Sequence, residues 1–224
     1  MNTKKGNSSI VLLDERLIFP PIENANADGL LAVGGDLSPE RLLLAYQSGI
    51  FPWFDRDSPI LWWSPDPRMV LYPHKIKISK SMRKVLRSDQ FQLTVNTCFE
   101  NVIDRCSHIK RSGQNGTWIT TEMIDAYIEL HKKGYATSYE VWENERLVGG
   151  LYGIDIGHIF CGESMFSTVS NASKFAFIRL AQDVEAKNYK VIDCQMHTEH
   201  LERMGASEIP RNSFIDLLKR NSSL

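Results

Sequence analysis

Three strand-like runs of apolar residues follow one another in the second half of the chain. They are TSYEVWE (137–143), ERLVGGLYGID (145–155) and HIFCGESMF (158–166), and short turns separate them. Consecutive strand patterns joined by short turns are typical of hairpins. The pattern therefore predicts an antiparallel meander.

A long helical pattern and a further apolar run follow this meander. The residues STVSN (167–171) are expected to begin a helix over ASKFAFIRLAQDVEAK (172–187), which leads to the run VIDCQ (191–195). A helix of this length between two strands forms a crossover, which makes the flanking strands parallel neighbours. The β-β-β-α-β order resembles the acetyltransferase-like (GNAT) fold, in which two adjacent parallel strands splay and leave a site between them. We therefore expect an α+β fold with a mixed sheet.

The first part of the chain predicts a short helix followed by an irregular aromatic segment. In SPERLLLAYQSG, Ser38 can cap a helix whose first residue is proline and which a glycine ends. The next segment, FPWFDRDSPILWWSPDP (51–67), holds four prolines and three tryptophans, too much proline for a regular element. We place a boundary near Asp66, between a small N-terminal α+β domain (1–66) and a larger acetyltransferase-like catalytic domain (67–224).

Composition places the chain among ordinary globular proteins. Of its 224 residues, 42% are hydrophobic and 24% are charged, values far from those of disordered or membrane proteins. The first residues lack the apolar stretch of a signal peptide. No apolar run approaches the roughly 18 residues that a membrane-spanning helix needs. We expect a cytoplasmic protein, a monomer without a cofactor.

The cysteines and histidines suggest no metal site. The four cysteines form no C-x-x-C pair, which favours free thiols in a reducing compartment. Cys194, His197 and His200 are three residues apart, a spacing that can suggest a metal. No second pair of ligands completes a tetrahedral set, so we expect no bound metal.

The net charge of −1 hides a basic segment on an acidic chain. Residues 67–88 contain seven basic residues and no acidic one. Within them, ISKSMRKVLR predicts a helix that presents one wholly basic face: Lys80, Arg83, Lys84 and Arg87. A solvated charged face is the alternative, but no acidic residues are interleaved to form pairs. We interpret this helix as a phosphate-binding surface.

Polar residues occur where strands should be apolar. Side chains in a strand alternate between faces, so Asp193 and Gln195 are expected on one face, as are Glu163 and Met165 on the neighbouring strand. If these faces coincide, Glu163, Asp193 and Gln195 form a polar cluster bordered by Met165 and Ile192. Such a cluster suits acid–base work or a cationic substrate. The alternative is a set of buried acids satisfied by backbone donors or nearby cations.

The loop before the long helix argues against acetyl-CoA as the acyl donor. Acetyl-CoA enzymes of this fold use a glycine-rich loop there to approach the pyrophosphate, whereas 167–171 contains no glycine. The basic helix suggests instead that the donor carries a nucleic acid. Trp53 and Trp118 lie outside regular alternation and could stack on a base. The alternative is that each packs in the core.

Taken together, the motifs resemble those of the leucyl/phenylalanyl-tRNA protein transferase family. The resemblance covers about Phe19 to Leu218, and its motifs follow the order of the family: LLAVGGDLSPERLLLAYQSGIFPWF, PILWWSPDPR, GTWIT, LVGGLYG, IFCGESMFS, NASK, IDCQ and GASEIPR. It implies a bacterial cytoplasmic enzyme that moves leucine or phenylalanine, and methionine less readily, from aminoacyl-tRNA to proteins with N-terminal Arg or Lys. The product would be marked for degradation through the N-degron route.

The resemblance also implies roles for individual residues. Trp53 and Trp118 would contact the terminal adenosine, and the basic helix would meet the acceptor stem. The pocket for the donor side chain would be lined by Leu151, Phe160, Met165, Phe177 and Ile192.

Three polar residues would then serve the reaction itself. Gln195 would accept a hydrogen bond from the attacking amine, Asp193 would orient the Gln195 amide, and Glu163 would help to hold a cationic group. The resemblance itself casts Gln195 as the base, polarised by Asp193. A neutral amide oxygen is a very poor proton acceptor, so we expect the hydrogen-bonding role for Gln195 instead. Two alternatives remain at this stage: a peptidoglycan-type aminoacyl-tRNA-dependent transferase, and a tRNA-binding module without catalysis.

Overall fold

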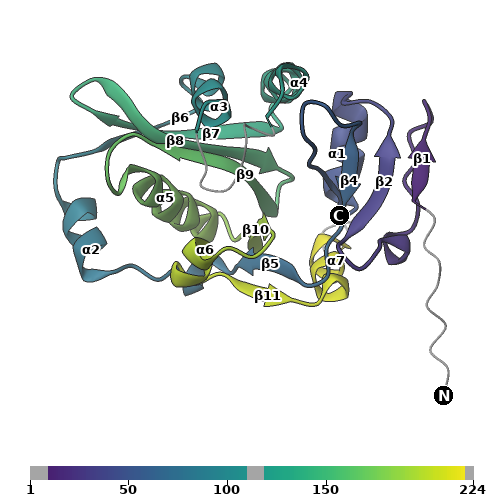
Figure 1. Cartoon of the computed structure of the whole chain (residues 1–224). Helices are drawn as coiled ribbons and strands as arrows, with labels where there is room; N and C mark the ends of the chain where they lie inside the picture. The colour runs from purple at the N-terminus through teal and green to yellow at the C-terminus, as the bar shows by residue number, and fades with distance from the viewer. Residues whose placement is uncertain (1–9, 110–118, 220–224) are drawn as a thin grey trace.

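Two β-sheets with helices packed around them form the molecule (Figure 1). The computed structural model describes residues 10–109 and 119–219. Within these ranges the smaller sheet has the strand order β1 (Val11–Leu13), β2 (Leu30–Gly34), β4 (Leu61–Trp63), β3 (Phe51–Pro52). The larger sheet has the order β11 (Ser207–Ile209), β5 (Arg68–Leu71), β10 (Val191–Gln195), β9 (Ile159–Ser167), β8 (Arg146–Asp155), β7 (Ala136–Glu143), β6 (Gln92–Val95).

The helices connect and cover these sheets. In chain order they are α1 (Pro39–Gln47), α2 (Lys80–Arg87), α3 (Phe99–Ser107), α4 (Thr121–Lys132), α5 (Ala172–Ala186), α6 (Glu199–Arg203) and α7 (Arg211–Lys219). Short 3-10 turns lie at Ile22–Asn24 and Pro73–Lys75. Among the described residues, no helix combines the length and the apolar character that crossing a membrane requires.

The two helices predicted from capping residues are confirmed. The side chain of Ser38 accepts the backbone N–H of Arg41 at the start of α1. Ser79 likewise accepts the N–H of Met82 at the start of α2. Each cap satisfies a backbone donor that the first helical turn leaves without a partner.

The predicted meander and crossover are also confirmed. β7, β8 and β9 pair antiparallel in succession, and α5 leads from β9 to β10, which pair parallel. The parallel register begins at Val191 opposite Ile159 and ends at Asp193 opposite Cys161. β9 and β10 then separate, although both strands continue. The splayed pair expected of the acetyltransferase-like arrangement is present, and the α+β class with a mixed sheet is confirmed.

The larger sheet separates two hydrophobic cores. α3 and α4 cover one face, and α5 covers the other (Figure 1). The first core holds the apolar residues of α3 and α4 together with those of the smaller sheet, and the second forms around α5. Side chains of β8 alternate between them, since Tyr152 packs in the first core and Leu151 in the second.

The position of β5 was not predicted. This strand inserts between β10 and β11 and is antiparallel to both. All four of its residues are buried, as expected for a strand covered on both faces. Asp66 lies in the link between β4 and β5, where the chain passes from the smaller sheet to the larger one. The division of the chain at this residue stays a prediction.

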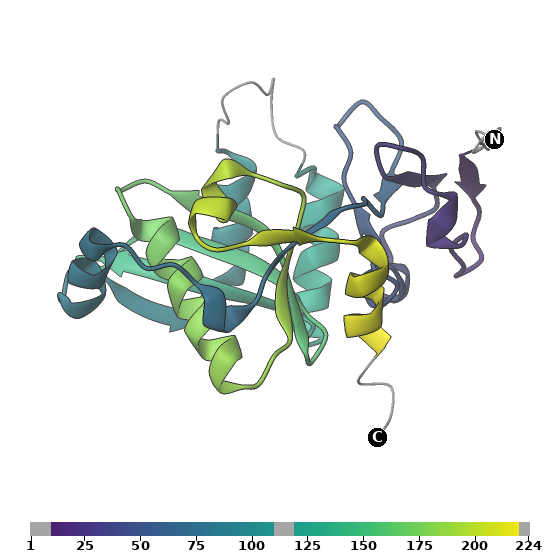
Figure 2. The same ribbon diagram turned by 90° about the horizontal axis from the view of Figure 1, so that it is seen from below.

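The last helix returns to the first part of the chain. α7 packs beside the elements of the smaller sheet (Figure 2). A Cβ added at Gly49, just after α1, would lie 2.5 Å from Cδ1 of Ile215 on α7. Gly49 also has a φ of +76°, which favours glycine. Glycine at this position therefore allows α7 to pack closely against the turn that follows α1.

Candidate active site

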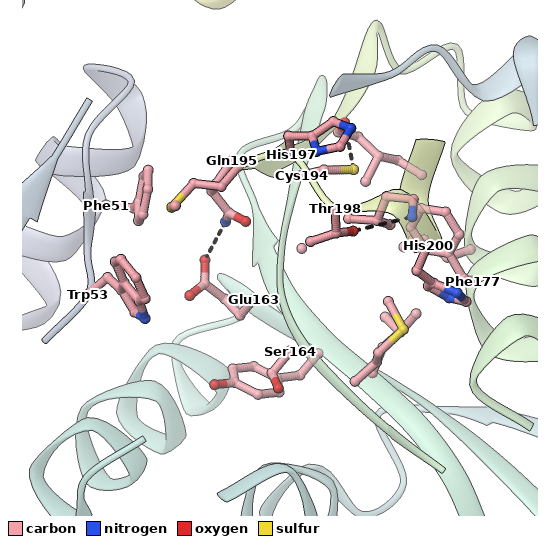
Figure 3. Close-up of a pocket in the computed structure, with 18 of the residues that line it drawn as sticks. Phe51, Trp53, Glu163, Ser164, Phe177, Cys194, Gln195, His197, Thr198 and His200 are labelled. Atoms are coloured by element: carbon pink, nitrogen blue, oxygen red, sulfur yellow. Dashed lines mark hydrogen bonds between the residues drawn. The ribbon is translucent and has the colours of Figure 1, made fainter. Parts of the chain in front are cut away.

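A cavity of about 520 Å³ opens where β9 and β10 separate (Figure 3). Residues from five parts of the chain line it: Phe51 and Trp53 from the end of β3, Leu151 and Tyr152 from β8, Gly162 to Met165 from β9, Phe177 and Leu180 from α5, and Ile192, Cys194 to Thr198, His200 and Leu201 from β10 and α6. Acid and amide groups from β9 and β10 therefore face an otherwise mainly apolar wall.

Glu163 occupies a bulge in β9. On β8, Tyr152 is opposite Ser164 and Gly153 is opposite Gly162, so Glu163 is the extra residue. The bulge reverses the alternation of the strand. The prediction that Glu163 and Met165 share a face is therefore wrong: Met165 packs toward the core of α5, whereas Glu163 contacts a tyrosine in the core of α3 and α4.

A chain of hydrogen bonds links Glu163 to two buried tyrosines. The Tyr127 hydroxyl on α4 donates to Oε2 of Glu163 at 3.0 Å, and the Tyr46 hydroxyl on α1 bonds to that of Tyr127. Burial keeps both tyrosines neutral, because it raises their pKa well above 10. Tyr127 therefore donates to Glu163, and Tyr46 donates to Tyr127.

Burial also raises the pKa of Glu163, to about 7. Removal from water disfavours the carboxylate, and the hydrogen bonds of Tyr46 and Tyr127 stabilise it in part. Glu163 is consequently poised to gain or lose a proton near neutral pH. An acid with this property beside a cavity is a candidate for proton transfer.

Gln195 is bonded to Glu163 through its side chain. Its Nε2 donates to Oε1 of Glu163 at 3.1 Å (Figure 3). The carboxylate must accept, so the amide nitrogen faces Glu163 and the amide oxygen points away. This oxygen accepts no hydrogen bond within the described residues. It is therefore available to a donor that enters the cavity.

Asp193 is not among the residues that line the cavity, and it forms a buried ion pair. Arg68 on β5 donates to it twice, from Nε at 2.8 Å and from a terminal nitrogen at 2.7 Å. Both side chains are almost completely buried. Arg68 also stacks on the rings of Phe51 and Phe214 and donates to the carbonyl of Gly49. The arrangement satisfies both charges inside the core.

Asp193 bonds to the backbone of Gln195 and not to its side-chain amide. Oδ1 of Asp193 accepts the backbone N–H of Gln195 at 3.0 Å, and the φ of Gln195 is +57°. A left-handed backbone is uncommon for a residue with a side chain, and it persists where neighbours hold it. The expectation that Asp193 orients the amide is therefore corrected, since Glu163 makes that contact.

The structure brings the predicted polar cluster together. Glu163 bonds to the side chain of Gln195, and Asp193 bonds to its backbone. The sequence did not identify Arg68, Tyr46 or Tyr127 as members. One signal existed for Arg68, because it is a single cation at the start of an apolar run that can reach a buried acid.

Most of the residues expected around the donor side chain line the cavity. Leu151, Met165, Phe177 and Ile192 form an apolar wall at the end near α5. Phe160 does not line it: the ring is buried behind this wall and packs edge-on against Tyr139, with centroids 6.3 Å apart.

Of the two tryptophans expected to contact the adenosine, Trp53 is within the described residues and lines the cavity. Trp53 lines the other end of the cavity, near Glu163 (Figure 3). Its ring is 5.6 Å from that of Trp63, and Trp63 Nε1 donates to the Trp53 carbonyl. Trp118 lies outside the described residues.

The basic helix is present as predicted. On α2, Met82 is buried and docks the helix, and the four cations are exposed and line a second cavity together with Ser88: Lys80, Arg83, Lys84 and Arg87. None of the four forms an ion pair with a residue in 10–109 or 119–219. Their charges are free for an anion from outside.

Known proteins share this sequence over nearly its full length. Residues 70–219 match the family model "Leucyl/phenylalanyl-tRNA protein transferase", and residues 35–66 match the model of its N-terminal domain. A leucyl/phenylalanyl-tRNA–protein transferase of Flavobacterium johnsoniae is 62% identical, covering 91% of this chain and 96% of that protein. One from Christiangramia forsetii is 57% identical, covering 89% and 95%.

A solved structure is similar at a lower level. L-PGS from Bacillus licheniformis has a TM-score of 0.43 and 13% identity, covering 81% of this chain and 69% of that one. The sequence matches are far stronger, and they extend across both sheets. On these matches, the chain belongs to the leucyl/phenylalanyl-tRNA protein transferase family.

Proposed function

We propose that the protein transfers leucine or phenylalanine, and methionine less readily, from aminoacyl-tRNA to the α-amine of proteins that begin with Arg or Lys. The products are marked for degradation, and the enzyme works as a cytoplasmic monomer. Membership of the family supports the reaction class. The observation that carries the proposal is the meeting of an apolar pocket with a carboxylate–amide pair where β9 and β10 separate.

The donor side chain occupies the apolar end of the cavity. Met165 and Leu151 are flexible walls that adapt to both leucine and phenylalanine. One methylene in such a pocket changes binding by only about 1–3 kcal/mol, so a shared pocket for two donors of different size is physically reasonable. The terminal adenosine lies toward Trp53, with Trp118 as a second contact. Phe160 supports the pocket from behind.

The acceptor amine approaches Gln195 and Glu163. The free amide oxygen of Gln195 accepts a hydrogen bond from the amine and aims its lone pair at the ester carbonyl. Glu163, which holds this amide in place, attracts the positively charged group and takes its proton. The pKa of Glu163 is about 7, and that of an α-amine is about 8, so the free-energy cost of transferring the proton is small.

The reaction then exchanges an ester bond for a peptide bond. The amine nitrogen bonds to the carbonyl carbon, and the bond from this carbon to the ribose oxygen breaks. The attacking nitrogen gives up two protons in all. Glu163 takes the first from the ammonium form before the attack, and later returns it to water. The second goes to the ribose oxygen, which leaves as a hydroxyl. Because the ester is already activated, correct placement of the two reactants provides much of the rate.

The basic helix binds the acceptor stem through phosphates. Lys80, Arg83, Lys84 and Arg87 give α2 an exposed positive surface. Contacts of this type give affinity without reading the base sequence. Discrimination between donors then rests on the apolar pocket.

The proposed reaction is tested with radiolabelled Leu-tRNA and a peptide that begins with Arg. We expect label in this peptide and none in the same peptide acetylated at its N-terminus, because only a free amine can attack. Phe-tRNA should serve as a second donor. Binding of tRNA without labelled peptide would contradict the proposal and favour a binding module.

Glu163→Gln should lower kcat/KM by about 100-fold, since proton transfer typically contributes at least that much. In the wild type, ionisation of Glu163 makes activity rise as pH increases through about 7. The variant should lose the rise in activity near pH 7, and keep the rise in activity that deprotonation of the α-amine causes. An unchanged profile would exclude Glu163 as the proton acceptor.

The same variant should remain folded. The pKa of Glu163 is raised in the folded state, so the carboxylate is less stable there than in the unfolded chain. Its contribution to stability is therefore present at low pH and disappears as the pH rises through about 7. Above that pH, Glu163→Gln should not lower the Tm, which separates an effect on the chemistry from an effect on the structure.

Asp193 and Gln195 should give different phenotypes. Gln195→Ala should lower kcat by about 100-fold with little change in Tm or tRNA affinity, because this partly exposed side chain lines the cavity and bonds there to Glu163. Asp193→Ala should destabilise the fold by about 3–5 kcal/mol, because it leaves the charge of Arg68 buried without a counter-charge. Urea unfolding and steady-state kinetics measure the two effects.

A double variant provides the control for this pair. Arg68→Met with Asp193→Leu removes both charges, and should recover part of the stability that the single variant lacks. It should not recover kcat, because the backbone N–H of Gln195 still has no acceptor at position 193. Full activity in the double variant would show that Asp193 does not position Gln195.

Replacing Arg83 and Lys84 by glutamine should weaken tRNA binding and reduce its salt dependence. The slope of log Kd against log salt should fall by about 1 for each phosphate that the protein no longer neutralises. Lys132→Gln on α4 is the matched control, because Lys132 is exposed but paired with Glu129. An unchanged slope for the α2 variant would place the acceptor stem elsewhere.

A further inference from the structure

The cavity reaches both faces of the larger sheet. At one end its walls belong to the core of α3 and α4, as Phe51 and Tyr152 do, and at the other end to the core of α5, as Leu151 and Phe177 do. A continuous sheet would separate these two ends. They connect because β9 and β10 stop pairing after Cys161 and Asp193.

Gly162 stands at this connection. It is the first residue of β9 beyond the last pair with β10, and it lines the cavity. A Cβ built on it would have one non-neighbouring heavy atom of the described residues within 4 Å, the carbonyl oxygen of Asp193 at 3.7 Å. That is an ordinary contact, so the added methyl would point into open space.

The fold itself does not require glycine at this position. Gly162 does not have the left-handed backbone that favours glycine. Nearby glycines of β8 differ: a Cβ on Gly153 would lie 2.2 Å from the Cys161 carbonyl oxygen, and one on Gly150 would lie 2.7 Å from that of Tyr139. Those two glycines serve packing, whereas residues 10–109 and 119–219 leave the space above Gly162 open.

We propose that Gly162 forms the neck through which the aminoacyl group crosses the sheet, with the α-carbon and ester carbonyl of the donor lying against its Cα. The inference rests on the proposed function and adds a positioning residue to it. The donor side chain then lies on the α5 side, and the ester lies on the side of Glu163 and Gln195. Glycine within a strand allows another backbone to approach closely, as this placement requires.

The neck explains why the two halves of the donor can occupy unlike surroundings. The side chain needs an apolar pocket, and the carbonyl needs polar groups and the attacking amine. The side chain and the carbonyl of an amino acid are both bonded to its α-carbon. Only a thin barrier, such as the backbone of a single residue, can therefore separate the apolar pocket from the polar groups. Directly after Gly162, the next side chain of the strand points to the opposite face, where the Glu163 carboxylate contacts Tyr127 and Gln195.

Gly162→Ala tests the proposal. The Tm should stay close to that of the wild type, because the methyl makes only an ordinary contact. Transfer should fall by about 100-fold in kcat/KM, since a displacement of about 1 Å at the reacting atoms has such an effect. The decrease should be the same for Leu-tRNA and Phe-tRNA, because the methyl meets atoms that both donors share. Affinity for uncharged tRNA should not change.

Two variants calibrate this result. Gly153→Ala should lower the Tm, because its methyl collides with the backbone. Phe177→Leu alters the wall of the side-chain pocket and should change the ratio of leucine to phenylalanine transfer. Gly162→Ala should change neither the Tm nor the ratio of leucine to phenylalanine transfer.

Three outcomes would overturn the inference. The first is wild-type transfer by folded Gly162→Ala, and the second is a fall in Tm as large as that of Gly153→Ala, which would make the glycine structural. The third is loss of transfer from one donor but not the other, which would place Gly162 in the side-chain pocket. A wild-type enzyme that labels no peptide from either donor would instead contradict the proposed function.

Discussion

The buried pair of Arg68 and Asp193 is the interaction on which the rest of the structure depends. Arg68 reaches elements from three parts of the chain: the Gly49 carbonyl and Phe51 near its start, Asp193 in β10, and Phe214 in the last helix. Two charges in an apolar core are costly unless geometry and further hydrogen bonds satisfy them. Here the same contacts that neutralise Asp193 also fix the strand end that presents Gln195.

The hydrogen-bonded chain from Tyr46 to Gln195 complements this pair on the cavity side. It passes through α1, α4, β9 and β10, so several distant elements contribute to the placement of one carboxylate. Burial destabilises the ionised form of Glu163, whereas the tyrosine hydroxyls stabilise it. The balance leaves the pKa of this acid near that of the α-amine that we propose as its partner. Asp193 is instead held by Arg68 and bonds to the backbone of Gln195.

Local patterns predicted the elements well, and long-range partners poorly. Ser38 and Ser79 mark helix starts through contacts within one turn, and the meander and crossover follow from consecutive runs, so these features were predictable. The insertion of β5 beside β10 joins residues far apart in the sequence, and no periodicity reports it. The bulge at Glu163 adds one residue to a strand, which reverses every face assigned beyond it. Bulges leave no clear composition signal, so the different faces of Glu163 and Met165 could not be predicted. The hydrogen bond between Glu163 and Tyr127 was missed because it joins a strand to a helix 36 positions away.

The division of the cavity by the sheet has a consequence for how such an enzyme diversifies. Phe177 and Leu151, which we propose meet the variable part of the donor, lie in the core of α5, whereas Glu163 contacts Tyr127 in the core of α3 and α4. Substitutions in one compartment therefore leave the electrostatics of the other intact. Substitutions in the side-chain pocket would then change which donors are accepted and leave the groups proposed for the chemistry in place.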